Sequence, residues 1–319
     1  MTSTEADRQP VFDLRGKRVW VAGHTGLVGS AILRRLQSED CELILTSHES
    51  LDLIRQADTE SFVERERPQA IFLAAALVGG ILANARFPVD YLYENLMIGV
   101  NVMRAAHTAG TEKLLWLGSS CIYPRDAAQP IREEALLTGP LEQTNETYAI
   151  AKIAGLKLAK AYCEQHGDRF MTVMPTNVYG PNDNFDPETA HVLPALIRKI
   201  HEAKQQSSTS VTLWGTGRPM REFLHVDDLA DACVHIVKFY DGVEPINVGA
   251  GREVSIRQLA EIIAGIVGFE GSFVFDSTKP DGTPRKLVET SKMKAIGWNA
   301  GISLESGIRD LYDHWLRTQ

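Results

Sequence analysis

Short apolar segments alternate with longer segments of helical periodicity through the first half of the chain. Strands are predicted where β-branched, aromatic and aliphatic residues run together, at 18–23, 41–47, 70–76, 113–120 and 170–177. Helices are predicted where apolar residues recur every three or four positions, at 27–37, 90–110 and 146–167. This alternation predicts an α/β fold with a doubly wound parallel sheet covered by helices on both faces.

The alternation fades after residue 180. A loop rich in Pro, Asn and Asp leads to a predicted helix at 191–204 and a short strand at 211–215, and two more helices and a strand at 272–276 follow from about 255. The apolar segment at 221–240 indicates a return to the first sheet. We therefore predict a first domain at 1–180, with a return crossing near 218–250, and a smaller mixed α/β domain that occupies most of 181–319.

The composition is typical of a globular protein, with 319 residues, 44% hydrophobic residues and a net charge of −8. This charge disfavours binding to nucleic acid or to an anionic membrane. The longest uncharged stretch, 71–85, is shorter than the ~20 residues that a membrane-spanning helix needs. The first ten residues are polar and lack the apolar core of a signal peptide.

The cysteines also indicate the compartment. There are four, at positions 41, 121, 163 and 233, and their spacing matches neither a zinc site nor a disulfide framework. We expect reduced thiols, a cytoplasmic location and no metal.

Three glycines follow the first strand at spacings of three. In a strand–turn–helix setting, Gly23 would make the tight turn, Gly26 would let a pyrophosphate approach the backbone, and Gly29 would pack the helix on the strand. The first domain is therefore predicted to bind a dinucleotide, and the second mainly to bind substrate. The second strand ends without an acid before Glu49, which favours NADP(H), although no arginine stands there and NAD(H) stays open.

A serine, a tyrosine and a lysine suggest carbonyl chemistry. Tyr148 and Lys152 are four residues apart and share one face of the predicted helix at 146–167. A phenol has a pKa of about 10, and a nearby ammonium is expected to lower it. Ser119 stands at the carboxyl end of the fourth strand, where its hydroxyl would hold the carbonyl oxygen that Tyr148 protonates.

With these features in this order, the chain resembles the extended short-chain dehydrogenase/reductase family from about residue 17 onward. The resemblance implies a Rossmann-type sheet, a nicotinamide cofactor and a nucleotide-sugar substrate. The stretches "GSSCIYP", "TNETYAIAKIAG", "GTGRPMREFLHVDD" and "KPDGTPRK" resemble the GDP-sugar epimerase/reductases of that family. Those enzymes invert C3 and C5 of GDP-4-keto-6-deoxy-D-mannose and reduce C4 with NADPH, which gives GDP-L-fucose.

Two further catalytic residues are implied by the resemblance: Cys121 as the base and His191 as the acid. Protons on carbons beside a ketone are acidic, and inversion needs their removal from one face and their return on the other. Thiols, with a pKa of about 8.5, and imidazoles, with a pKa of about 6.5, suit these roles near neutral pH. Taken alone, Cys121 is better explained by packing, and His191 is better explained as a helix cap or a surface residue.

The remaining contacts follow from the glycine loop, the strand ends and the resemblance. The predicted cofactor-binding residues are Gly23, His24, Thr25, Gly26, Leu27, Val28, Gly29, Leu117, Gly118, Ser119, Ser120, Tyr148, Lys152, Pro175, Thr176, Asn177, Val178 and His191. The predicted substrate-binding residues are Lys199, Trp214, Arg221 and Asp281. Core packing explains Trp214 nearly as well, and Asp281 is also suited to opening a turn.

The family often carries arginine in the glycine loop and at the end of the second strand, where this chain has Thr25 and the sequence "TSHES". The 2′-phosphate of NADP would then contact Ser47 and His48. Three alternatives stay open: another GDP-4-keto sugar of the colitose or heptose type, a redox-neutral epimerase that keeps its NAD bound, and a non-catalytic NAD(P)-binding protein. The resemblance also implies a homodimer formed through the helices at 90–110 and 146–167.

Overall fold

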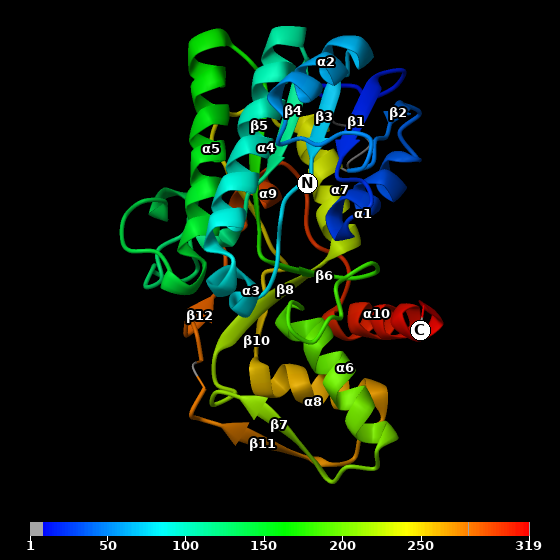
Figure 1. Cartoon of the computed structure of the whole chain (residues 1–319), viewed down its shortest axis with the longest axis vertical. Coiled ribbons are helices and arrows are strands. Elements are labelled where there is room, and N and C mark those ends of the chain that lie inside the picture. Colours follow the sequence, from blue (N-terminus) through cyan, green and yellow to red (C-terminus); the bar gives the residue numbers. More distant parts are fainter. Residues whose placement is uncertain (1–8, 280, 319) are drawn as a thin grey trace, which may run out of the picture.

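The computed structural model describes residues 9–279 and 281–318. Its strands in the first half are β1 (Arg18–Ala22), β2 (Glu42–Ile44), β3 (Ala70–Leu73), β4 (Lys113–Leu117) and β5 (Phe170–Pro175), joined later by β9 (Ile246–Val248). They form one parallel sheet in the order β2-β1-β3-β4-β5-β9 (Figure 1). The winding direction reverses between β1 and β3, which opens a crevice at the carboxyl ends of the strands, where ligands bind in open α/β sheets.

Helices cover both faces of this sheet because successive strand residues point to opposite sides. Val19 and Val21 of β1 join a core with α1 (Leu27–Leu36) and α7 (Val226–Phe239). Trp20 and Ala22 join a second core with α2 (Gln56–Glu66), α4 (Pro88–Ala109) and α5 (Glu146–His166). Strands buried on both faces explain the nearly continuous apolar segments in the sequence.

A second lobe contains α6 (Val192–Gln205), α8 (Ile256–Val267) and α10 (Leu304–Thr318), which surround a core of their own. Beside them lies a parallel pair of strands, β7 (Ser210–Trp214) and β11 (Ser272–Asp276), at the lower end of the view in Figure 1.

A third, small sheet connects the two lobes. Its central strand is β8 (Met220–His225), which pairs with β6 (Asn177–Tyr179), β10 (Glu253–Ser255) and β12 (Arg285–Lys286). Because β8 continues directly into α7, the chain returns to the large sheet there. The short helices are α3 (Ile81–Arg86), α9 (Ser291–Ala295), η2 (Ser120–Ile122), η3 (Glu133–Ala135) and η4 (Gln143–Asn145).

The predicted fold class is confirmed, and the division into domains at residue 180 stays a prediction. The strands predicted at 41–47 and 70–76 are too long, since β2 and β3 end at Ile44 and Leu73. After Leu73 the chain leaves the sheet to pass close to the glycine loop. The sequence pattern does not predict helix α2 or strand β9. Few apolar positions mark α2, which buries only Thr59, Phe62 and Val63.

Across the described ranges, no helix is long and apolar enough to cross a membrane. The same ranges hold no cluster of three His, Cys or acidic side chains suited to a metal ion. Residues 1–8, which contribute to the prediction of no signal peptide, lie outside the described part of the chain.

Candidate functional site

The glycine loop between β1 and α1 has the geometry of a phosphate cradle. Gly23 has a φ of +85°, and a Cβ there would lie 2.8 Å from the Ala75 backbone. A Cβ on Gly29 would overlap the carbonyl oxygen of Gly23, whereas one on Gly26 would meet nothing closer than 3.6 Å. Protein packing therefore requires glycine at 23 and 29, while Gly26 leaves open space for a ligand.

The start of α1 also fits an anion. Gly26 occupies the N-cap position and has no side chain that could accept hydrogen bonds from the free N–H groups of the first turn. These groups are the usual ligands of a pyrophosphate. Close by, Nδ1 of His24 is buried and has no hydrogen-bond partner among the described residues. The loop is therefore suited to the diphosphate of a dinucleotide.

Most other predicted cofactor residues lie at the carboxyl ends of two neighbouring strands. Leu117 ends β4 and is followed by Gly118, Ser119 and η2, while Pro175 ends β5 and is followed by Thr176 and β6. The Asn177 amide and the Thr176 hydroxyl both donate to the carbonyl oxygen of Glu222, at 2.8 and 3.2 Å. This links the end of β5 to β8 and fixes one wall of the crevice.

Tyr148 and Lys152 lie on α5 as predicted, but the ammonium contacts the backbone. Lys152 is 2% exposed, and its Nζ donates to the carbonyl oxygen of Leu117 at 2.9 Å. It lies 5.7 Å from the centroid of the Tyr148 ring. Burial lowers the pKa of Lys152 to about 7, and burial together with the charge of Cys121 raises the pKa of Tyr148. The expectation that Lys152 lowers the Tyr148 pKa is wrong, because the Lys152 ammonium is directed at the Leu117 carbonyl oxygen and burial raises the Tyr148 pKa.

Cys121 lies in η2, two residues after Ser119. Its backbone N–H donates to Oγ of Ser119 at 3.2 Å, and its Sγ accepts a hydrogen bond from Nζ of Lys286 at 3.6 Å. Burial alone would raise the pKa of Cys121. The ammonium of Lys286, with hydrogen bonds from Ser119 and Asn145, outweighs burial and leaves this pKa below its ordinary value. The thiol therefore has the surroundings of a reactive cysteine.

Neither Lys286 nor Asn145 was singled out from the sequence. Lys286 is 165 positions from Cys121, and contacts between distant segments, among them the pairing of β12 with β8, bring it there. Asn145 stands three residues before Tyr148 in "TNETYAIAK". The sequence motif includes this residue, but its contact with the thiol is visible only in the structure.

His191 occupies the N-cap position of α6, but its side chain caps nothing. Its imidazole lines a cavity whose wall partly desolvates the ring and lowers its pKa, although the residue as a whole is exposed. The interpretation of His191 as a helix cap therefore fails, and the ring is available to a ligand.

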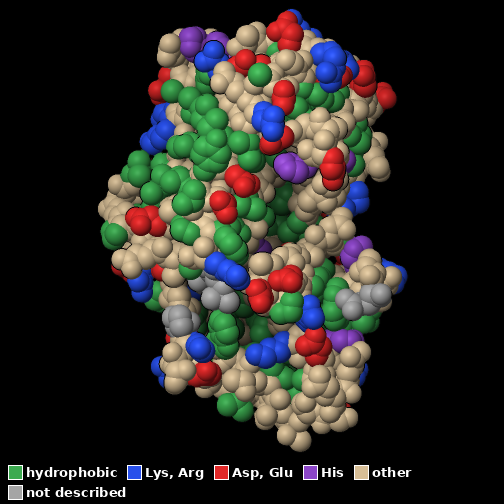
Figure 2. Space-filling model, viewed as in Figure 1, with side chains coloured by type: hydrophobic (Ala, Val, Ile, Leu, Met, Phe, Trp, Pro, Cys, Tyr) green, Lys and Arg blue, Asp and Glu red, His purple; other side chains and the backbone are tan. Residues whose placement is uncertain are grey.

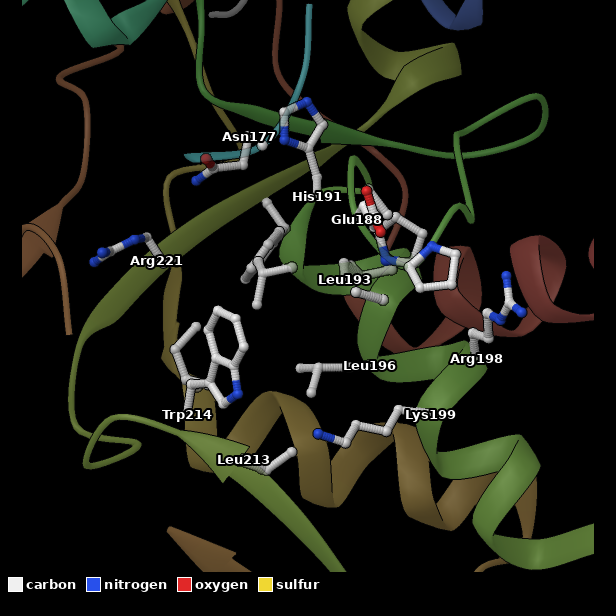
Figure 3. Close-up of a pocket in the computed structure, with 18 of the residues that line it drawn as sticks. Asn177, Glu188, His191, Leu193, Leu196, Arg198, Lys199, Leu213, Trp214 and Arg221 are labelled. Atoms are coloured by element: carbon white, nitrogen blue, oxygen red, sulfur yellow. The ribbon is translucent and has the colours of Figure 1, made fainter. Parts of the chain in front are cut away.

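The cavity has a volume of about 610 Å³ and lies between the two lobes, lined by Asn177, Val178, His191, Lys199, Trp214 and Arg221 among others. Figure 3 shows Trp214 and Lys199 directed toward each other, with His191 at the upper end and Arg198 pointing away. Trp214 is 54% exposed, which rules out core packing. Arg221 connects the cavity to the thiol, because it pairs in register with Lys286.

Asp281 differs from the other predicted substrate residues. Its two carboxylate oxygens accept hydrogen bonds from the backbone N–H and the hydroxyl of Thr216, at 2.6 and 2.8 Å. They brace the turn after Trp214, in which Gly215 has a φ of +74°. Asp281 is not among the residues that line the cavity. The structure thus brings Lys199, Trp214 and Arg221 together and gives Asp281 the role of a turn brace.

Comparison with known proteins agrees with this geometry. Residues 19–249 match the model of the NAD dependent epimerase/dehydratase family. The chain is 56% identical to GDP-L-fucose synthase 1 of Arabidopsis thaliana, over 95% of this chain and 94% of the relative. It is 54% identical to the GDP-L-fucose synthase of Sinorhizobium fredii, over 96% and 98% of the two chains. A GDP-L-fucose synthetase of Naegleria fowleri bound to NADP is 29% identical, with a TM-score of 0.88 over 98% of each chain. The chain therefore belongs to the NAD dependent epimerase/dehydratase family and, within it, to the GDP-L-fucose synthases.

Proposed function

We propose that the protein converts GDP-4-keto-6-deoxy-D-mannose to GDP-L-fucose, inverting C3 and C5 and then reducing the C4 ketone with NADPH. The observation that carries this is the position of Cys121, whose thiol has a lowered pKa two residues from Ser119. A simple ketone reductase uses a serine, a tyrosine and a lysine and has no need of a base at this point. The names of the relatives at 54% and 56% identity support the same reaction.

The cofactor is assigned to the crevice between β1 and β3. The diphosphate would lie on the first turn of α1, and the nicotinamide end would reach Ser119 and Asn177. When bound, NADPH supplies the hydride for C4. At the end of β2, Thr46, Ser47 and Ser50 form a cluster of hydroxyls in which the Thr46 and Ser50 oxygens are 2.8 Å apart. We assign this cluster and His48 to the 2′-phosphate.

Inversion requires a base and an acid. Cys121 would remove the proton from the carbon beside the ketone, and the ammonium of Lys286 favours the thiolate that this step needs. His191 would return a proton from the other face. Because desolvation in the cavity lowers the pKa of His191, its charged form is a stronger acid than a free imidazolium. We therefore expect a bell-shaped pH dependence for inversion.

Reduction uses a different set of side chains. Burial keeps Tyr148 protonated at neutral pH, so its hydroxyl can donate a proton to the C4 oxygen as the hydride arrives. Ser119 would hold that oxygen by a hydrogen bond. Lys152 holds the carboxyl end of β4 in place through the carbonyl oxygen of Leu117.

The GDP group is assigned to the 610 Å³ cavity. Lys199 and Arg221 would bind the diphosphate, since cations in a partly desolvated cleft attract phosphate strongly. The exposed face of Trp214 offers a surface against which a base or sugar ring can stack. Asp281 would act indirectly, because it holds the turn that presents Trp214.

The direct test is an assay of purified protein with GDP-4-keto-6-deoxy-D-mannose and either NADPH or NADH. We expect oxidation of NADPH in step with formation of GDP-L-fucose. Faster turnover with a GDP-4-keto sugar of the colitose or heptose type would transfer the assignment to that substrate. Turnover without net oxidation of the cofactor would indicate a redox-neutral epimerase, and no turnover with any of these would indicate a binding protein.

We also propose that the protein is a homodimer formed through α4 and α5. These helices pack side by side and expose Val89, Tyr93 and Ile150, whose exposed fractions are 73%, 54% and 44%. Figure 2 shows hydrophobic side chains gathered over this part of the surface. Four neighbouring helices, two from each copy, would bury them.

Charge placed in this surface is expected to separate the dimer. Tyr93→Asp should shift the molar mass measured by light scattering from that of two chains to that of one, because a carboxylate is costly to bury. Glu261→Gln on the opposite lobe is a control that should leave the mass unchanged. A monomeric wild-type protein would contradict the proposal.

We place the protein in the cytoplasm, where thiols stay reduced. All four cysteines are free in the structure, which agrees with such a compartment. Detection of the protein in an extracytoplasmic fraction of its cells would contradict this assignment.

A further inference from the structure

The ammonium that contacts the Cys121 sulfur has no other charged partner in the described part of the chain. Lys286 donates to Sγ at 3.6 Å, and no carboxylate among the described residues forms an ion pair with it. Its neighbour Arg285, in contrast, pairs with Glu253 at 2.8 Å. A half-buried ammonium directed at a sulfur rather than at an acid favours the thiolate form.

The backbone around Lys286 is held from three sides. The N–H of Leu287 donates to Oε1 of Gln129 at 2.9 Å, and the N–H of Val288 donates to a carboxylate oxygen of Glu222 at 3.0 Å. Ile131 donates its N–H to the carbonyl oxygen of Leu287 at 2.7 Å. A two-residue strand is too short to hold its own position, so these contacts fix where the ammonium points.

Glu222 is the buried centre of this frame. The residue is fully buried, and its carboxylate also accepts a hydrogen bond from the N–H of Gly251 at 2.7 Å. It thereby joins β8 to the segment that carries Lys286 and to the loop after β9. Buried carboxylates are tolerated only when hydrogen-bonded in this way. The Glu222 carboxylate therefore serves to fix the position of β12, and with it the position of Lys286 beside Cys121.

We propose that Lys286 is a positioning residue for Cys121. The Lys286 ammonium holds the Cys121 sulfur as a thiolate next to Ser119 and aims it at the substrate. This inference rests on the proposed function, which makes Cys121 the base. Lys286 donates a hydrogen bond to the sulfur and takes no part in the proton transfer itself. The proton leaves the sugar carbon for the sulfur, and the electron pair of the broken C–H bond moves into the enolate.

Other groups also face the sulfur, and their effects on its ionisation must be distinguished from that of Lys286. Ser119 and Asn145 are neutral hydrogen-bond donors, Arg221 carries a second positive charge, and Tyr148 is an uncharged phenol at neutral pH. Arg221 donates to the carbonyl oxygen of Met220 at 2.8 Å instead of to the thiol. Lys286 is therefore the cation that should contribute most to stabilising the Cys121 thiolate.

The test measures alkylation of Cys121 by iodoacetamide as a function of pH, in protein without substrate, with the modified residue identified by mass spectrometry. An opposite charge within a few ångströms typically moves a pKa by about 1–3 units. We therefore expect the midpoint of alkylation to rise by at least about one pH unit in Lys286→Met, with a rate near neutral pH about tenfold lower. Lys286→Arg keeps the charge and should restore most of the reactivity.

Matched controls separate this effect from a general change of charge or of fold. Lys294→Met removes one positive charge from an exposed position eight residues further along and should leave the midpoint unchanged. Circular dichroism and binding of NADPH report whether each variant is folded. If Lys286→Met does not fold, Lys286→Gln provides the same loss of charge with a polar side chain.

Steady-state kinetics distinguish this role from substrate binding. If Lys286 acts through the thiol, kcat of Lys286→Met should fall at neutral pH and recover as the pH rises, with KM little changed. A raised KM with an unchanged alkylation midpoint would instead assign Lys286 to the substrate and overturn the proposal. Because alkylation is measured without substrate, it stands apart from the assay of the proposed function. A wild-type protein with a reactive thiol and no turnover would refute that function alone.

Discussion

Serine in place of Cys121 is expected to slow inversion of the sugar carbons about 10²–10⁴-fold, the usual contribution of one general acid or base. A hydroxyl loses its proton far less readily than a thiol, and the ammonium of Lys286 at 3.6 Å then has no thiolate to stabilise. The change removes little volume, so binding of NADPH and the fold should be kept. The measurement is the rate of solvent-hydrogen exchange at C3 and C5 of the GDP-sugar.

Two comparisons make this result specific. Cys41→Ser changes a thiol that lies far from the cavity in sequence and in the fold and should leave turnover unchanged. A substrate already inverted at both carbons should still be reduced by Cys121→Ser, because reduction does not use the thiol. Wild-type exchange in Cys121→Ser would show that the sulfur only packs at the end of β4.

Phenylalanine in place of Tyr148 is expected to slow the reduction of C4 and to leave the inversion of C3 and C5 intact, the reverse of the effect of Cys121→Ser. Loss of the hydroxyl removes the proton donor for the C4 oxygen, so oxidation of NADPH should slow by about 10²–10⁴-fold. The ring keeps its edge contact with Tyr91, whose ring centroid is 6.3 Å away, so the fold should persist. Exchange at C3 and C5 should continue, since it depends on Cys121 and His191.

The measurement follows NADPH oxidation and deuterium uptake in the same sample. Tyr162→Phe, which removes a tyrosine hydroxyl further along α5 and away from the cavity, is the matched control and should behave like the wild type in both. Unchanged NADPH oxidation in Tyr148→Phe would assign the proton donor to another group. Loss of both activities with an intact fold would contradict the separation of inversion from reduction.

The sequence predicts the elements with strong local patterns. Strand β1, its glycine loop and helices α1, α4 and α5 follow from unbroken periodicity and from the glycines at 110 and 167 that end the two long helices. Tyr148 and Lys152 are placed on one face by their spacing alone. These are local properties, which a single stretch of chain determines.

What the sequence does not predict depends on contacts between distant segments. Lys286 reaches Cys121 in part because β12 pairs with β8, and Glu222 fixes that pairing from inside the protein. The Tyr148 pKa is raised and not lowered as predicted, because burial is a property of the whole fold and Lys152 is directed at the Leu117 carbonyl oxygen. Trp214 shows the same limit, since only the cavity distinguishes a ligand-facing indole from a core one.

The central claim is that a thiol and an imidazole invert the two carbons beside a ketone which a tyrosine then helps to reduce. The most direct measurement is NMR of the product formed from GDP-4-keto-6-deoxy-D-mannose and NADPH by the wild-type protein in D₂O. The account predicts deuterium at both C3 and C5 of the GDP-L-fucose formed. A reduced product with hydrogen retained at both carbons would contradict it and leave an ordinary ketone reductase.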